Sequence, residues 1–199
     1  MSTKLELLED LARTQTVLRP ADLRRLDLPT SYLGRLVRAG RLVRRTRGVY
    51  ALAEAEISSY HDWELACLRV PHGVLCLTTA LMFHEIGTQS PRVVWMAIDG
   101  KAWQPRIEYP TVRFVRFSGS ALHHGVMTAS SGQTTLRVTT VAKTVADCFK
   151  YRRKLGLDVA VEALREGWRE RKFTMADLDV AARVCRVARV MQPYLEMLP

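Results

Sequence analysis

Residues 31–50 read SYLGRLVRAGRLVRRTRGVY, a stretch with six arginines and no acidic residue. An apolar stripe at i, i+3, i+4 spacing starts at Leu33, and Gly40 stands where a helix C-terminus favours glycine. Residues 42–52 then predict two paired strands around Gly48, which supplies the positive φ that a tight turn often needs. A short helix followed by a basic two-stranded ribbon is the order of a winged helix-turn-helix.

Two further helices are predicted before this stretch. Leucines recur at helical spacing over residues 3–14, which predicts an amphipathic first helix. Pro20 favours the start of a second helix of about two turns, which should end before Pro29. We expect Thr30 to cap the third helix by accepting a backbone N–H.

The third helix and the ribbon together predict a DNA-binding surface. Polar side chains on the face opposite the apolar stripe suit base edges in a major groove, and the ribbon arginines suit phosphates. The start of the helix and its polar face contribute Thr30, Ser31, Tyr32, Arg35 and Arg38, and the phosphate contacts are Arg41, Arg44, Arg45 and Arg47. The simpler alternative is a solvated basic hairpin on an ordinary helical domain.

Charge and composition are consistent with a separate basic module. The 199-residue chain has a net charge of +10, of which residues 1–52 contribute +6 from eleven basic and five acidic side chains. Apolar residues make up 48% of the chain, enough for one good core or two modest ones. Small and polar residues over 53–59 indicate a linker, so we predict domains at 1–56 and 57–199.

The second predicted domain alternates helical and strand patterns, and the chain as a whole is therefore expected to be α+β. Helices are predicted over residues 60–69, from Thr78/Thr79, from Thr139/Thr140, over 159–168 and over 175–195, and strands over 93–98 and 112–117. Thr174 and Asp177 resemble a capping box at the start of the last helix. The mixed domain should thus end in helices.

Chemical motifs are sparse, and we predict no catalytic residue, no metal site and no cofactor. Lys143 and Asp147 have i, i+4 spacing and are interpreted as an exposed pair on one helix. His123 and His124 sit in a small-residue segment typical of a surface loop, and the four cysteines lack the spacing of a zinc site. The chain is expected not to be an enzyme. The alternative is a metal-dependent, nuclease-like enzyme that uses the basic domain as a DNA clamp, and a protein-docking role for the second domain also stays open.

Three segments of the sequence occur in a characteristic order. They are Leu36-Val-Arg-Ala-Gly-Arg-Leu42 leading into Arg47-Gly-Val-Tyr50, then Leu77-Thr-Thr-Ala-Leu81 with Ile86-Gly87, and Thr139-Thr-Val-Ala-Lys-Thr-Val-Ala-Asp147. Together they resemble the AbiEi-type antitoxins, which are transcriptional regulators of type IV toxin–antitoxin systems. The resemblance implies an N-terminal winged helix and an α/β antitoxin domain, in which Lys143 and Asp147 are candidate residues and Lys143 replaces a more common arginine.

The same resemblance implies the partners. The chain is expected to repress its own promoter by binding inverted repeats in double-stranded DNA, as a monomer or a weak dimer. Its second domain is expected to counteract a nucleotidyltransferase-like toxin without obligatory contact. The acidic N-terminus does not fit an export signal and no apolar run is long enough to span a bilayer, so we expect a cytoplasmic protein with no membrane contact.

Overall fold

The computed structural model describes residues 8, 11–12, 18–53, 60–89, 93–131 and 134–198. The chain divides into two compact units, unit 1 comprising Met1–Leu65 with Ser130–Thr135, and unit 2 comprising Ala66–Ala129 with Leu136–Pro199. The division passes through a helix and a hairpin, and each unit is described by itself. The domain boundary predicted at residues 56/57 falls on 54–59, outside the described residues, and stays a prediction.

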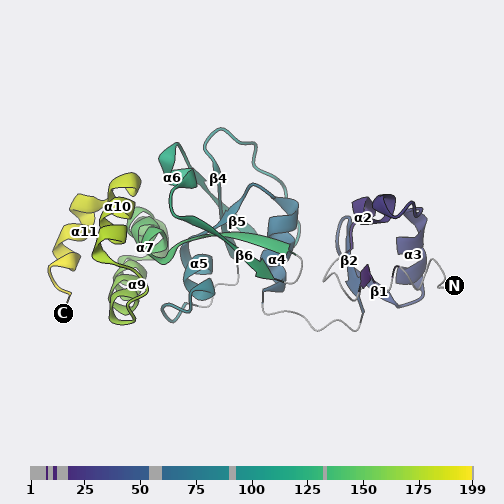
Figure 1. The fold of residues 1–199 in the computed structure, drawn as a ribbon, viewed down its shortest axis with the longest axis horizontal. Coiled ribbons are helices and arrows are strands. Elements are labelled where there is room, and N and C mark those ends of the chain that lie inside the picture. Colours follow the sequence, from purple (N-terminus) through teal and green to yellow (C-terminus); the bar gives the residue numbers. More distant parts are fainter. Residues whose placement is uncertain are drawn as a thin grey trace. The chain divides into compact units, whose positions relative to one another are not determined.

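The N-terminal part of unit 1 consists of two short helices and a hairpin (Figure 1). Helix α2 spans Pro20–Arg25 and α3 spans Ser31–Arg38, followed by strands β1 (Leu42–Thr46) and β2 (Val49–Leu52). The strands pair antiparallel, with an irregularity between Arg44 and Thr46. Leu18 forms an isolated antiparallel bridge to Tyr50, which adds a short third segment to the ribbon.

Helices α2 and α3 end in the same kind of backbone turn. After α2, Asp27 has a φ of 54°, and the Leu28 N–H bonds the Leu23 carbonyl at 2.9 Å. After α3, Gly40 has a φ of 69°, and the Arg41 N–H bonds the Leu36 carbonyl at 2.9 Å. A left-handed residue followed by a 6→1 bond is a Schellman motif, which satisfies carbonyls that would otherwise lack partners. The predicted role of Gly40 is confirmed.

Two expectations for unit 1 have different outcomes. Thr30 stands at the N-cap of α3 with a helical backbone and makes no side-chain capping bond, so the predicted capping role is wrong. The predicted helix over 3–14 lies mostly outside the described residues, where only Leu8, Leu11 and Ala12 are assigned, all three as helical. The core of this unit is built almost entirely of leucine and consists of Leu8, Ala12, Leu18, Leu23, Leu28, Leu33, Leu36 and Leu42.

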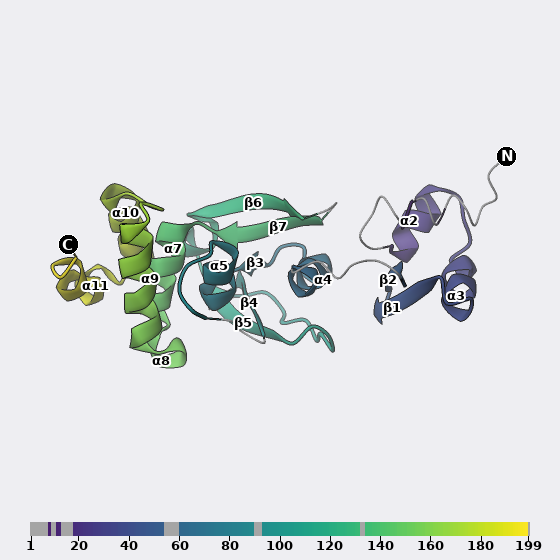
Figure 2. The same cartoon turned by 90° about the horizontal axis from the view of Figure 1, so that it is seen from below.

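A mixed five-stranded sheet lies at the centre of the rest of the chain, in the order β5-β4-β3-β7-β6. Strands β4 (Val94–Asp99) and β5 (Val112–Phe117) pair in parallel and confirm the two predicted strands. The sequence reading missed β3 (Val74–Leu75), β6 (Val126–Ser131) and β7 (Thr134–Thr139), of which β6 and β7 run side by side along one edge (Figure 2).

Helices precede the sheet strands and follow them. The expected helix over 60–69 is α4 (His61–Arg69), and α5 spans Leu77–Phe83 and packs against β4. The prediction that Thr78 or Thr79 caps α5 is wrong. The helix already begins at Leu77, so both threonines lie buried within its first turn. The Thr79 hydroxyl instead accepts the Trp95 N–H at 2.9 Å and ties α5 to the sheet. A short helix, α6 (Ser120–His123), follows β5.

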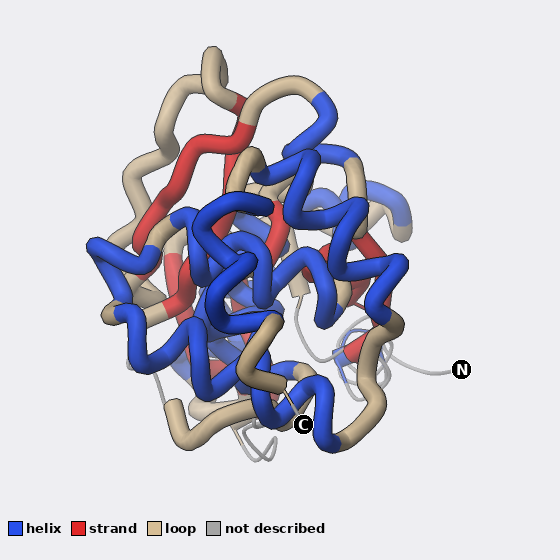
Figure 3. Tube along the Cα trace, turned by 90° about the vertical axis from the view of Figure 1, so that its left-hand side faces the viewer, coloured by secondary structure: helices blue, strands red, loops and turns tan. Residues whose placement is uncertain are grey.

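The chain ends in a layer of helices, which lies in front of the sheet strands in the view of Figure 3. Helix α7 packs against α5, α9, α10 and α11 and is the centre of this layer. The predicted capping box is confirmed, since the Thr174 hydroxyl accepts the Asp177 N–H at 3.1 Å. The single helix expected over 175–195 divides at Arg186, which has a φ of 59°. The bounds are α7 Val141–Lys150, α8 Arg152–Leu155, α9 Leu157–Arg169, α10 Met175–Cys185 and α11 Ala188–Leu195.

Candidate nucleic-acid interface

Helix α3 is strongly two-sided. Leu33 and Leu36 are buried in the core of unit 1, with exposed fractions of 2% and 3%. Ser31, Arg35 and Arg38, on the other side, are exposed. A helix of eight residues with one apolar and one basic face is anchored by burial of the first and leaves the second for a ligand. The structure thus places these predicted contact residues on one outward face.

Two contacts restrain the side chains on this face. The Arg35 guanidinium lies over the Tyr32 ring at 5.2 Å from its centroid, within the range of a cation–π interaction. The Arg38 Nε donates to the Gly34 carbonyl at 3.3 Å, which uses one of the five N–H donors of that side chain. Tyr32 is half-buried because it also packs against the leucine core. This packing restrains the ring over which the Arg35 guanidinium lies.

The hairpin carries the remaining cations. Arg41, Arg44 and Arg47 are exposed, whereas Arg45 is half-buried and its Nε is shielded from solvent. Strand β1 packs against α3, so the basic strand adjoins the basic helix. Of the four predicted phosphate contacts, three are therefore exposed. The fourth, Arg45, is partly buried and lies at the irregularity of the β1–β2 pairing.

The sequence of this surface is exclusively basic among its charged residues. Residues 31–53 contain no aspartate or glutamate. On the N-terminal side the preceding carboxylates belong to α2 and its end, and the buried Asp22 accepts the Arg19 N–H at 2.9 Å. A dense array of guanidinium groups is an unfavourable arrangement in isolation and becomes favourable against a polyanion.

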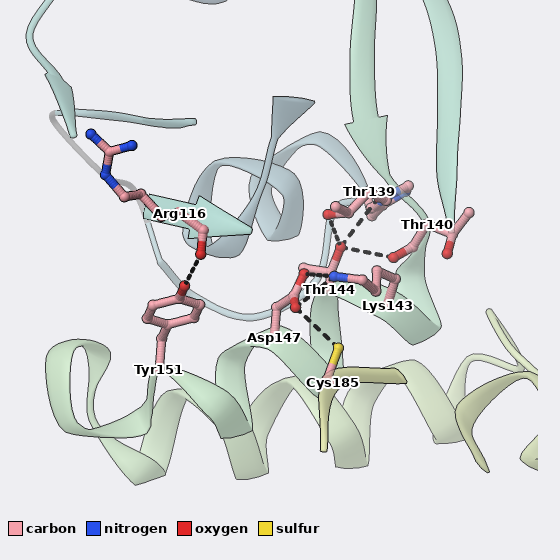
Figure 4. A network of polar contacts seen from close by, with 9 residues as sticks. Arg116, Thr139, Thr140, Lys143, Thr144, Asp147, Tyr151 and Cys185 are labelled. Carbon is pink, nitrogen blue, oxygen red and sulfur yellow. Dashed lines mark hydrogen bonds and ion pairs between the residues drawn. The ribbon is translucent and has the colours of Figure 1, made fainter. Parts of the chain in front are cut away.

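The pair formed by Lys143 and Asp147 overturns the expectation of an exposed helix pair. Both side chains have an exposed fraction of 0%, and the Lys143 Nζ donates to both carboxylate oxygens of Asp147 at 2.6 Å (Figure 4). The Cys185 thiol, from α10, donates to the same carboxylate at 3.2 Å. The Phe117 ring faces the ammonium from β5, with its centroid 4.2 Å from Nζ. Because α7 is covered by its neighbours, its polar i, i+4 pair is enclosed.

Burial governs the chemistry of this pair and of the thiols around it. Desolvation raises the pKa of Asp147 from its ordinary value, and the ammonium of Lys143 opposes that rise. Burial also raises the pKa of the Cys185 thiol to about 12, and it raises the pKa of the Cys148 thiol as well. All four cysteines are buried and form no disulfide. An enclosed ion pair among neutral thiols is suited to holding α7, α10 and β5 together.

Other predicted chemical groups stay apart. Among the described residues, no group of three or more histidine, cysteine, aspartate and glutamate side chains could hold a metal ion. His123 is exposed at the end of α6, a helix where the sequence indicated a loop. The helices of the described part of the chain are also too short and polar to cross a membrane.

In comparisons with known proteins, a family model matches the N-terminal part of the chain. No curated protein matches the sequence. The crystal structure of the RV2827C protein from Mycobacterium tuberculosis has a TM-score of 0.57 and 16% sequence identity, over 97% of this chain and 80% of that one, which supports the mixed α+β fold. Residues 6–53, the segment that holds α2, α3 and the basic hairpin, match the family model of AbiEi antitoxin transcriptional regulators, which confirms the resemblance over that part of the chain.

Proposed function

We propose that this chain is a DNA-binding transcriptional regulator of the AbiEi antitoxin type, with a winged helix-turn-helix in unit 1. The observation that carries the proposal is the outward basic face of α3 beside an arginine-rich hairpin, within the segment that matches the family model. Helix α2, the turn and α3 supply the helix-turn-helix, and β1–β2 supplies the wing. The proposal assigns no catalytic step to the chain.

The two groups of side chains divide the work of recognition. Ser31, Arg35 and Arg38 face outward from a helix that suits the major groove, and with the half-buried Tyr32 they are the base-reading candidates. Exposed arginines of the wing contact phosphates and give affinity without sequence preference. Thr30 is exposed at the helix start and its side chain makes no capping bond, so it stays a contact candidate. Arg45, being half-buried, is a weaker phosphate candidate than Arg44 or Arg47.

The regulator is further proposed to repress its own promoter at inverted repeats, as a monomer or a weak dimer. As the antitoxin of a type IV system it would counteract a nucleotidyltransferase-like toxin without obligatory contact. The support for these two statements is the family of residues 6–53. The role of unit 2 in antitoxin action is part of this proposal.

Binding to a labelled duplex taken from upstream of the chain's own gene tests the proposal. The full chain is titrated by fluorescence anisotropy against that duplex and against a scrambled duplex of equal length and composition. We expect Arg47→Ala to weaken binding to both, and Arg35→Ala to reduce mainly the difference between them, because a bidentate base contact contributes about 1–3 kcal/mol of discrimination. Arg153→Ala, at an exposed arginine of α8, is the matched control and should change neither.

Two results would count against the proposal. Equal affinity of the native chain for the two duplexes would remove the claim of sequence-specific regulation. Equal losses for the Arg35 and Arg47 variants on both duplexes would remove the division of roles between helix and wing. A footprint on the upstream DNA of the same gene would then decide whether any site is occupied.

A further inference from the structure

The connection between β4 and β5 in unit 2 presents a large aromatic side chain to solvent. Trp103 is 77% exposed, whereas Trp63 and Trp95 are buried. The described residues 100–111 contain no helix or strand, so the indole is carried by an irregular loop. Isolated apolar residues on a surface are ordinary, but an indole that is 77% exposed on a loop held in place and rich in cations requires a reason.

The loop is fixed to the sheet by a single guanidinium. The Arg116 Nη1, from β5, donates to the carbonyls of Gly100 and Ala102 at 2.9 Å and lies 3.3 Å from that of Asp99. The hydroxyl of Tyr151, the C-cap residue of α7, in turn donates to the Arg116 carbonyl at 3.0 Å (Figure 4). The residue directly before Trp103 is thereby tethered, which reduces the conformational entropy that a ligand must remove on binding.

The charges carried by the loop and β5 are mainly positive. Lys101 and Arg106 flank Trp103 in the sequence of the loop, and Arg113 and Arg116 belong to the edge strand β5; all four are exposed. The Arg113 guanidinium lies over the Trp95 ring, 5.6 Å from its centroid, so Lys101 and Arg106 are the cations of the loop itself. The exposed acids of the same region are Asp99, whose carboxylate accepts the Lys101 N–H at 2.7 Å, and Glu108. The loop and β5 thus combine a net positive charge with the exposed indole of Trp103 and the half-exposed ring of Tyr109.

We propose that this loop, with Trp103 at its centre, binds unpaired bases of a single-stranded nucleic acid. An indole stacks on any base whose face is free, and arginine and lysine beside it bind the phosphates between bases. Paired bases in an undistorted duplex have both faces covered by their neighbours, so a duplex suits this loop less well. The site is distinct from the duplex-binding face proposed for α3 and the wing.

Fluorescence of the full chain tests the proposal, because Trp103 is far more exposed than Trp63 or Trp95. Twelve-nucleotide oligo(dT), oligo(dA), oligo(rU) and a hairpin duplex are titrated in parallel at about 50 mM salt. We expect the three single strands to quench the emission and the hairpin to leave it unchanged. The DNA and RNA strands separate the two sources of unpaired bases. Excess hairpin should not displace the single strand, and Arg47→Ala should bind it normally, so failure of this site and of the duplex site are distinguishable.

Variants of Trp103 test whether the indole is responsible for single-strand binding. Trp103→Ala should weaken single-strand affinity by roughly five- to a hundredfold, as expected for the loss of one stacked base, and Trp103→Phe should retain most of it. Met197→Ala, which removes another side chain that is 65% exposed, is the control and should bind as the native chain does. The proposal would be overturned if Trp103→Ala and Met197→Ala bound a labelled single strand, followed by anisotropy, with equal affinity. Quenching by the hairpin alone, or no binding of any strand at low salt, would also overturn it.

Discussion

Removing one partner of the buried pair should destabilise unit 2 far more than removing both. Lys143→Met leaves the Asp147 carboxylate, with an exposed fraction of 0%, facing only the Cys185 thiol. Asp147→Asn leaves the ammonium against the Phe117 ring and an amide. An uncompensated buried charge costs about 3–5 kcal/mol, whereas replacing both members by apolar residues of similar volume is often close to neutral. The double variant Lys143→Met/Asp147→Leu should therefore recover most of the loss.

Urea unfolding of the full chain, followed by Trp95 and Trp168 emission in unit 2, measures these changes. With a slope of about 1–3 kcal/mol per molar, a loss of about 3–5 kcal/mol lowers the midpoint by about 2 M. The matched control is the i, i+4 pair Asp179–Arg183 on α10, where the two side chains are 52% and 75% exposed. Replacing either member there should cost less than about 0.5 kcal/mol, because an exposed pair is screened by solvent.

The pH dependence of the Lys143→Met variant gives a second readout. Burial raises the pKa of Asp147 above its ordinary value of 3.8, and Lys143 opposes that rise. Without the lysine the folded-state pKa rises further, so the folded chain binds more protons than the unfolded chain between the two pKa values. Stability of the variant should thus increase as the pH falls, and its deficit should be smaller at pH 5 than at pH 8.

The reasoning fails if the energies combine additively. A double-mutant cycle in which the two single losses simply sum would show that the partners do not interact across 2.6 Å. Single losses below about 1 kcal/mol, no larger than a typical point mutation, would show that water reaches the pair. If a single variant does not accumulate as folded protein, the double variant still decides the matter, since it should fold.

Three further predictions concern backbone and thiols. In α3, Gly34→Ala should stabilise unit 1 by about 0.5–1 kcal/mol, since a Cβ there meets nothing within 4 Å, and Gly40→Ala at φ 69° should destabilise it by about 1 kcal/mol, as read from hydrogen exchange. Gly125→Ala should lower the urea midpoint of unit 2, because its Cβ would lie 2.7 Å from that of Lys143. Cys185 and the other buried thiols should resist a disulfide reagent at pH 8 until the chain unfolds.

The parts of the fold that could be predicted from the sequence are those set by local rules. Gly40 ends α3 because only a left-handed residue continues into the Schellman turn, and this requirement is visible in the sequence. The strands β4 and β5 are continuous apolar or alternating runs, and the capping box of Thr174 and Asp177 is a three-residue spacing. Each of these signals is complete within a few residues.

The features that were predicted wrongly or not at all are those that depend on tertiary structure. Threonine and serine make up six of the twelve residues of β6 and β7, so the apolar alternation that marks a strand is limited to Leu136 and Val138. Lys143 and Asp147 have the spacing of an exposed pair, and only the packing of α7 against its neighbours shows that both are enclosed. The half-burial of Arg45 depends on an irregularity in strand pairing that the run of arginines does not reveal. In the candidate interface, the sequence predicts the contact residues, and the structure adds how accessible each of them is.

The salt dependence of duplex binding by the full chain tests the central claim most directly. The exposed wing arginines Arg41, Arg44 and Arg47 with a partly accessible Arg45 should give a slope of log K against log salt of about −3 to −4, since each phosphate contact contributes about −0.9. Arg47→Ala should reduce the slope by about one unit. No binding at about 50 mM salt, or a slope that is unchanged when Arg44 and Arg47 are both alanine, would contradict the account.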